Sequence, residues 1–322
     1  MFDARITRRE LIKTAGAAVP VISASLTSSS RGANPAGGAT IGISTLEFRK
    51  YTNAQLAGEL AAAGIHMIQL YLNQTDSRYW KYNGRSDLSD LTTSRCEAIA
   101  RAYRSAGITL HSMGVYTNLI HGDPAERRAN LAYFEDMMKA GGAMGIRMFV
   151  TEAGHYEPEK PTAGFAYHFR QQVWEQMRAT MKELAEMAER HDATVLLEPS
   201  FAGFLASAKR TRVFLQEVNS PRIRALLDPA NILEVDDLEE MFDQLTPWID
   251  CIHAKDRKLH VEQGVPAGQG DLDYRKFVSL ALRRTPRAPL ILEYVGPDNY
   301  KQALQHLQKA LRDEAASSSR SS

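Results

Sequence analysis

Four apolar runs in the second half of the chain each end in a side chain that can bind a metal ion. The runs are "LLE", "LLD", "CIH" and "LILE", and their last residues are Glu198, Asp228, His253 and Glu293. Desolvating one unpaired carboxylate is costly, and three close together are worse unless a cation compensates them. Three carboxylates and one imidazole form a mixed ligand set that suits Mn²⁺, Mg²⁺, Co²⁺ or Zn²⁺. For Asp228 alone, a salt bridge at a rim is an alternative, but the four together favour a divalent metal site.

These side chains would meet if their runs are strands that end at one common edge. From Thr40 onward, short β-branched runs alternate with helical patterns, and the predicted strands begin at residues 40, 66, 108, 147, 194, 223, 249 and 289. Such alternation implies parallel strands joined by right-handed crossovers, and eight units in roughly 275 residues are typical of a (β/α)8 barrel. A doubly wound open sheet is less favoured, because "TIGISTLEF" lacks the glycine pattern of a nucleotide-binding turn.

The residue patterns that indicate helices lie between the predicted strands, as a (β/α)8 barrel requires. Gly64, Gly107 and Gly145 stand just before the second, third and fourth predicted strands, where the glycine that ends a helix is expected. One long helix carries an apolar stripe that we expect to pack on the sheet, formed by Trp174, Met177, Met181, Leu184 and Ala188. We therefore predict one (β/α)8 domain, a TIM barrel, over residues 40–314 and a disordered serine-rich tail over 315–322.

In such a barrel the chemistry takes place at the C-terminal ends of the strands. Glu152 and His155 in "TEAGHYE" follow the fourth strand and face the same mouth, where they either orient a substrate or serve the structure. Lys255 and Asp256 follow His253 directly, and they either contact substrate hydroxyls or form a salt bridge at the rim.

The ordered Glu, Asp, His and Glu, with "HAKD" and "PAGQGDLDY" after the seventh strand, resemble the xylose isomerase-like sugar phosphate isomerase/epimerase superfamily. The resemblance runs from about Thr40 to about Leu311. It implies that the four residues bind one divalent metal and that Glu198 and Glu293 act as acid and base on opposite faces of the substrate carbon. Removing a proton next to a carbonyl needs such a base together with an electrophile, which the metal would supply. Gly268 resembles part of the family's loop over the site.

One position departs from the pattern of many relatives. They carry Asp-x-x-His after the sixth strand, whereas this chain has Asp228-Pro229-Ala230-Asn231. Asparagine can hydrogen-bond a sugar hydroxyl, but it is a poor metal ligand and cannot shuttle a proton, so we expect Asn231 to bind substrate. A multi-metal nuclease site is disfavoured. The net charge of +1, without a basic cluster in the body of the chain, also argues against nucleic acid as a partner.

The N-terminus predicts export. Residues 7–13, "TRRELIK", resemble the twin-arginine signal, and a weakly apolar stretch and a Ser/Gly/Pro linker follow up to residue 39. The stretch is too short to span a membrane, so we expect the twin-arginine machinery as a partner, cleavage, no stable membrane anchor afterwards and a bacterial periplasmic location. A disordered basic tail is the alternative. An exported protein meets few sugar phosphates, so an unphosphorylated sugar is the expected substrate.

The leading hypothesis is therefore an enzyme, a divalent-metal-dependent isomerase or epimerase acting on an unphosphorylated carbohydrate. A lyase that eliminates the aglycone of a 3-keto-glycoside would begin with the same proton abstraction, and a non-catalytic sugar-binding barrel is the third possibility. The two cysteines, Cys96 and Cys251, require no disulfide. The sequence carries no heptad or edge element that would indicate an oligomeric state.

Overall fold

The computed structural model describes residues 39–160, 166–261 and 264–319. The predicted export signal and linker, residues 1–39, lie outside this part except for residue 39. The fold given below is that of the compact unit Ala36–Ser322. Among the described residues, no helix is both long enough and apolar enough to span a membrane.

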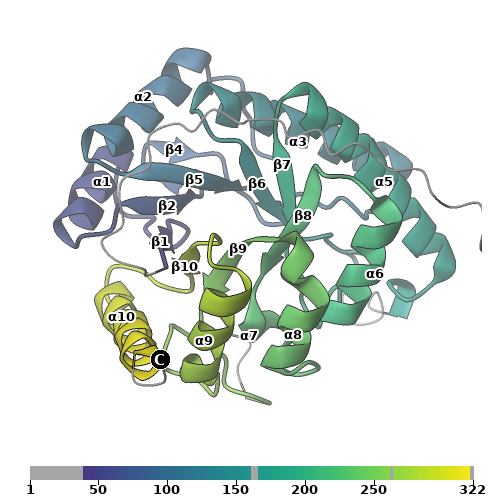
Figure 1. Ribbon diagram of the computed structural model, residues 1–322. Coiled ribbons are helices and arrows are strands. Elements are labelled where there is room, and N and C mark those ends of the chain that lie inside the picture. The colour runs from purple at the N-terminus through teal and green to yellow at the C-terminus, as the bar shows by residue number, and fades with distance from the viewer. Residues whose placement is uncertain (1–38, 161–165, 262–263, 320–322) are drawn as a thin grey trace, which may run out of the picture. The chain divides into compact units, whose positions relative to one another are not determined.

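Within the described residues, eight parallel strands close into a barrel (Figure 1). The strands are β1 (Ile41–Ser44), β2 (Met67–Leu70), β5 (Thr109–Gly114), β6 (Met148–Thr151), β7 (Thr194–Leu197), β8 (Ile223–Leu227), β9 (Ile249–Ala254) and β10 (Leu290–Leu292). Their order around the barrel is β1-β10-β9-β8-β7-β6-β5-β2, and Ile43 of β1 closes it by pairing with Leu292 on one side and Ile68 on the other. The predicted (β/α)8 barrel is confirmed, and each predicted strand overlaps one of these eight.

Helices surround the ring of strands (Figure 1). They are α1 (Asn53–Ala62), α2 (Thr93–Ser105), α3 (Pro124–Ala143), α5 (Gln171–Arg190), α6 (Ala208–Val218), α7 (Pro229–Ile232), α8 (Leu238–Leu245), the 3₁₀ helix η1 (Thr246–Trp248), α9 (Tyr274–Arg284) and α10 (Tyr300–Ser318). The structure also contains a short antiparallel hairpin, β3 (Asn73–Gln74) with β4 (Ser77–Arg78), which the sequence did not predict.

Local signals account for the helix ends. Gly64, Gly107 and Gly145 each have a φ of +73°, the left-handed conformation that ends a helix, so this prediction is confirmed. All five residues of the predicted stripe on α5 are buried. The C-terminal prediction needs a correction, because α10 continues to Ser318 and residues 315–318 are helical. Ala315 and Ala316 favour helix strongly enough to continue it past 314; residues 320–322 lie outside the described part.

The barrel interior is a small apolar layer beneath the mouth. It consists of Tyr71, Tyr116, Val150, Leu196, Leu226, Cys251 and Ile291. A larger core lies between the barrel and the helices, with fully buried residues such as Phe149 and Phe214. Cys96 and Cys251 are both buried and free. The interior layer sets the register of the site, because side chains two positions further along a strand point to the same side.

Candidate active site

The period of two along the strands brings the predicted ligands together. Glu198, Asp228, His253 and Glu293 each stand two residues after an inward-facing member of the interior layer, namely Leu196, Leu226, Cys251 and Ile291. They therefore face the barrel axis one step nearer the mouth. Glu152 stands two residues after Val150 and follows the same rule.

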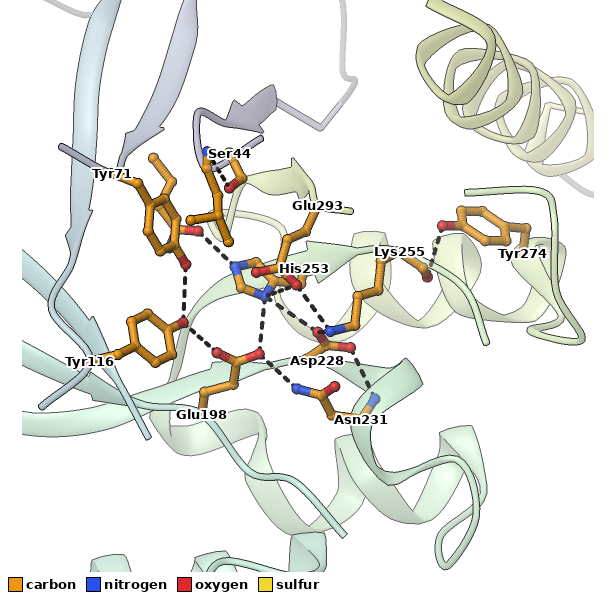
Figure 2. A network of polar contacts seen from close by, with 12 residues as sticks. Ser44, Tyr71, Tyr116, Glu198, Asp228, Asn231, His253, Lys255, Tyr274 and Glu293 are labelled. Carbon is orange, nitrogen blue, oxygen red and sulfur yellow. Dashed lines mark hydrogen bonds and ion pairs between the residues drawn. The ribbon is translucent and has the colours of Figure 1, made fainter. Parts of the chain in front are cut away.

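The four ligand-type residues form one buried cluster (Figure 2). Each offers a ligand atom, and these atoms all lie within 4.8 Å of one another. Nδ1 of His253 lies 3.2 Å from Oε1 of Glu198 and 3.3 Å from both Oδ2 of Asp228 and Oε2 of Glu293. The side chains that the sequence predicted to converge do so.

Lys255 belongs to this cluster and does not lie at an exposed rim. Its Nζ is 2.9 Å from Oδ2 of Asp228 and 3.0 Å from Oε2 of Glu293, and it lies 4.3 Å from the ring centre of Tyr294. Only 2% of the residue is exposed. The ammonium group therefore neutralises part of the carboxylate charge from within the site.

The charges of the cluster fit a divalent cation. Burial by itself would lower the pKa of His253, but the carboxylates of Glu293 and Glu198 outweigh it and raise the pKa to about 10. The pocket thus favours a positive charge at Nδ1. With Lys255 charged and His253 neutral, three ionised carboxylates leave two negative charges, which one divalent ion would balance. The donor set of three carboxylates and an imidazole is suited to such an ion.

Gln69 on β2 contacts the other side of the histidine ring. Its Oε1 lies 2.8 Å from Nε2 of His253, and the residue is fully buried. Nε2 of His253 can therefore donate to the amide oxygen while Nδ1 faces the carboxylates. Gln69 was not predicted from the sequence, although a polar residue at the inward-facing register of a strand was a signal for it.

Tyr116 and Asn231 hold the carboxylate of Glu198. The hydroxyl of Tyr116 donates to Oε2 at 2.6 Å, and Nδ2 of Asn231 donates to Oε1 at 2.7 Å. Tyr71 in turn donates to the hydroxyl of Tyr116 at 3.1 Å (Figure 2). Asn231 was predicted to bind substrate, and the structure shows it beside the cluster in contact with Glu198. Neither tyrosine was predicted from the sequence.

Glu293 has a different environment from Glu198. Burial raises its pKa, although the charges of His253 and Lys255 act in the opposite direction. Its backbone neighbour Tyr294 adopts a φ of +57°, which a non-glycine residue adopts rarely. This conformation follows directly after Glu293 at the end of β10.

A cavity of about 320 Å³ opens beside the cluster, over the ends of β6, β7 and β8. Glu198 and Asn231 line it together with Glu152 and His155, which the sequence predicted to face the mouth. The hydroxyl of Tyr82 donates to Oε2 of Glu152 at 2.6 Å. Burial, and then the charge of Glu198, raise the pKa of Glu152 to about 7, whereas burial lowers the pKa of His155.

Asp256 and Gly268 shape the loop that follows β9. Oδ1 of Asp256 accepts the backbone N–H groups of Arg257 at 2.8 Å and Leu272 at 2.9 Å, and Oδ2 accepts that of Gly268 at 3.1 Å. Gly268 has a φ of +83°, and a Cβ there would lie 2.6 Å from the ring of His306. Neither residue lines the cavity, so their contacts support a role in loop structure, and direct substrate contact stays a prediction.

Comparison with known proteins agrees with this fold. Residues 57–310 match the model of the xylose isomerase-like TIM barrel family. The L-ribulose-5-phosphate 3-epimerase UlaE of Escherichia coli is 24% identical over 239 residues, which cover 71% of this chain and 78% of UlaE. Two solved structures have the same fold. The D-psicose 3-epimerase of Clostridium cellulolyticum H10, solved with D-tagatose, has a TM-score of 0.64 at 15% identity. The superposition covers 86% of this chain and 98% of the epimerase chain. A xylose isomerase-like TIM barrel protein of Mycobacterium smegmatis, solved with magnesium, has a TM-score of 0.62 at 16% identity. Here the superposition covers 85% of this chain and 96% of the Mycobacterium chain. The chain belongs to the xylose isomerase-like TIM barrel family.

Proposed function

We propose that the protein is a divalent-metal-dependent epimerase or isomerase that acts on an unphosphorylated sugar or sugar derivative. The observation that carries the proposal is the buried cluster of Glu198, Asp228, His253 and Glu293, whose ligand atoms lie within 4.8 Å of one another beside an open cavity. The L-ribulose-5-phosphate 3-epimerase UlaE and the D-psicose 3-epimerase to which the chain is similar are both sugar epimerases by name, which supports this reaction class.

The proposed reaction moves one proton. A divalent cation held by the four residues would polarise the substrate carbonyl and so acidify the neighbouring C–H bond. Glu198 and Glu293 reach the centre from β7 and β10, which β8 and β9 separate in the barrel, so their carboxylates approach a bound sugar from different sides. One carboxylate removes the proton, and return of a proton to the opposite face gives the epimer without net oxidation or reduction.

The other residues of the site position these two groups. Tyr116 and Asn231 each donate to one oxygen of Glu198 and so fix the plane of its carboxylate. Lys255 lies between Asp228 and Glu293, where its charge limits the repulsion between carboxylates. A site that is organised before the substrate arrives avoids rearrangement during the reaction.

The decisive experiment is solvent exchange. The protein, loaded with Mn²⁺ and in a second series with Mg²⁺, would be incubated in D₂O with L-ribulose, D-psicose, D-tagatose and D-fructose. We expect deuterium at the carbon next to the carbonyl of at least one sugar, detected by mass spectrometry and NMR, with the epimer as product. Exchange should fall at least about a hundredfold in Glu198→Gln, because removal of one catalytic group costs on the order of 10² to 10⁴.

A matched control is Glu183→Gln, which removes an exposed carboxylate from α5 and should leave exchange unchanged. No exchange with any sugar, in protein that demonstrably holds one metal ion per chain, would contradict the proposed function. The same experiment with 3-keto-glucosides distinguishes a lyase, because elimination releases the aglycone and epimerisation does not.

We further propose that the protein is exported by the twin-arginine route into the periplasm. The support is the "TRRELIK" pattern at residues 7–13 and the linker that follows. Arg8→Lys combined with Arg9→Lys should retain the protein in the cytoplasm of a bacterial host, as measured by cell fractionation. Unchanged export of the double variant would contradict this proposal.

A further inference from the structure

The cavity contains one carboxyl group that the proposed reaction does not use. Glu152 follows β6, and its Oε2 accepts the hydroxyl of Tyr82 at 2.6 Å. Its other oxygen makes no hydrogen bond or ion pair within the described residues. Glu152 also lies outside the group of four whose ligand atoms converge. It therefore faces the cavity with one oxygen held and one available to a ligand.

Tyr82 fixes the position of this carboxyl group. It lies on the connection between β4 and α2, far from Glu152 in sequence, and its ring lies 6.2 Å from that of Tyr116, measured between centroids. The hydroxyl of Tyr116 in turn donates to Glu198. Glu152 and the catalytic carboxylate Glu198 are thus anchored by two tyrosines that contact each other.

The positive charges near the cavity are already matched. Lys255 pairs with Asp228 and Glu293, and Nε of Arg257 lies 3.0 Å from Oε1 of Glu234. Burial lowers the pKa of His155, which favours the neutral imidazole. The second reason for the raised pKa of Glu152 is the charge of Glu198, which a divalent ion on the cluster would offset. Burial, the larger cause, keeps the pKa of Glu152 raised, to about 7, so above that pH Glu152 is ionised and faces the cavity as a negative charge.

We propose that Glu152, held by Tyr82, is the residue that selects uncharged sugars and excludes sugar phosphates. The inference rests on the proposed function and adds the specificity of its site. A sugar hydroxyl can donate to the available oxygen of Glu152, whereas a phosphate group offers mainly acceptors and the same sign of charge. Like charges placed together at a binding site weaken binding strongly. The relatives named above include an epimerase of a sugar 5-phosphate and one solved with a free sugar, so the fold itself does not decide this choice.

The test compares binding of matched sugars to Mn²⁺-loaded protein by titration calorimetry. The pairs are L-ribulose with L-ribulose 5-phosphate and D-fructose with D-fructose 6-phosphate. We expect the wild type to bind at least one free sugar tenfold or more tightly than its phosphate ester. The ratio of these two affinities should fall about tenfold in Glu152→Gln. Tyr82→Phe, which releases the carboxyl group but keeps its charge, should reduce the ratio less. Glu159→Gln removes an exposed charge from the same connection and should leave the ratio unchanged.

Inorganic phosphate gives a second measurement that does not depend on the identity of the sugar. We expect Glu152→Gln to bind phosphate several-fold more tightly than either the wild type or Glu159→Gln. Equal binding of ester and free sugar by the wild type, or an unchanged ratio and unchanged phosphate affinity in Glu152→Gln, would overturn the inference. If no sugar binds to any variant, the proposed function fails, and the phosphate titration still decides whether Glu152 repels the anion.

Discussion

Gln69 and His253 meet inside the barrel, where Oε1 of Gln69 lies 2.8 Å from Nε2 of His253. The two residues are far apart in the sequence and lie on β2 and β9. A histidine that donates one ring nitrogen to a fixed acceptor presents the other nitrogen, unprotonated, to a metal ion. Gln69 therefore holds His253 in the orientation that directs Nδ1 at the three carboxylates.

Replacing Gln69 by leucine should weaken metal binding. Loss of a residue that orients a metal ligand typically costs ten- to a hundredfold in affinity, and we expect a loss in this range for Mn²⁺. The measurement is a Mn²⁺ titration followed by electron paramagnetic resonance. Gln69→Glu keeps an oxygen acceptor and should retain most of the affinity. Wild-type affinity in a folded Gln69→Leu protein would show that His253 needs no such support.

Removing the imidazole should abolish the stabilisation that metal gives. A ligand that binds only the folded state stabilises it by about 2.7 kcal/mol at a concentration of a hundred times its dissociation constant. Mn²⁺ should therefore raise the melting temperature of the wild type and have little effect on His253→Ala, which should lose most bound metal. His191→Ala, at the C-terminal end of α5 and outside the cluster, serves as the control. Full metal occupancy in His253→Ala would contradict the assignment of His253 as a metal ligand.

The four converging ligands could be predicted from the sequence because strand ends carry their own signal. Each lies at the end of an apolar run, and a barrel brings all such ends to one mouth. The same spacing of two residues along a strand explains why Glu152, which stands two residues after Val150, faces the mouth. Residues at the inward-facing positions of the strand ends can therefore be predicted to converge even when their individual contacts are unknown.

The contacts that hold these ligands could not be predicted in this way. Gln69 lies on β2 and Tyr116 lies just past the end of β5, and their partners are selected by the closure of the barrel, which no local pattern encodes. The hairpin of β3 and β4 was missed because two-residue strands are too short to show an alternation. Asp256 was predicted either to contact substrate hydroxyls or to form a salt bridge at the rim, and no local pattern indicated that its carboxylate accepts three backbone N–H groups of its own loop.

The hydroxyl of Tyr116 should matter for turnover more than for substrate binding. It donates to Oε2 of Glu198 at 2.6 Å in a buried site, and hydrogen bonds to charged groups are worth about 1.5–3 kcal/mol. In Tyr116→Phe we expect the exchange rate with the best substrate to fall by about ten- to a hundredfold, with a much smaller change in KM. Tyr71→Phe is the matched control, because its hydroxyl reaches Glu198 only through Tyr116 and its loss should cost less. Equal rates for Tyr116→Phe and the wild type would remove Tyr116 from the catalytic machinery.

His168 should make the fold sensitive to acid. It is fully buried and its Nε2 accepts the backbone N–H of Tyr156 at 3.2 Å, which requires a neutral ring nitrogen. Burial, with smaller contributions from His155 and Arg210, lowers its pKa from 6.5 to about 4. The unfolded chain then binds a proton at a higher pH than the folded one, so stability is complete above pH 6.5 and is lost as the pH falls toward 4.

The loss attributable to His168 amounts to about 3 kcal/mol at pH 4, because each unit of pKa difference corresponds to about 1.4 kcal/mol. Urea unfolding of metal-free protein between pH 7 and pH 4 measures it. His111, whose pKa burial also lowers to about 4, contributes to the same slope in the wild type. His168→Gln keeps a hydrogen-bond acceptor without the titration, so its free energy of unfolding should fall less steeply over this range than that of the wild type. Parallel curves for the two proteins would mean that the ring of His168 accepts its proton in the folded state as readily as in the unfolded chain.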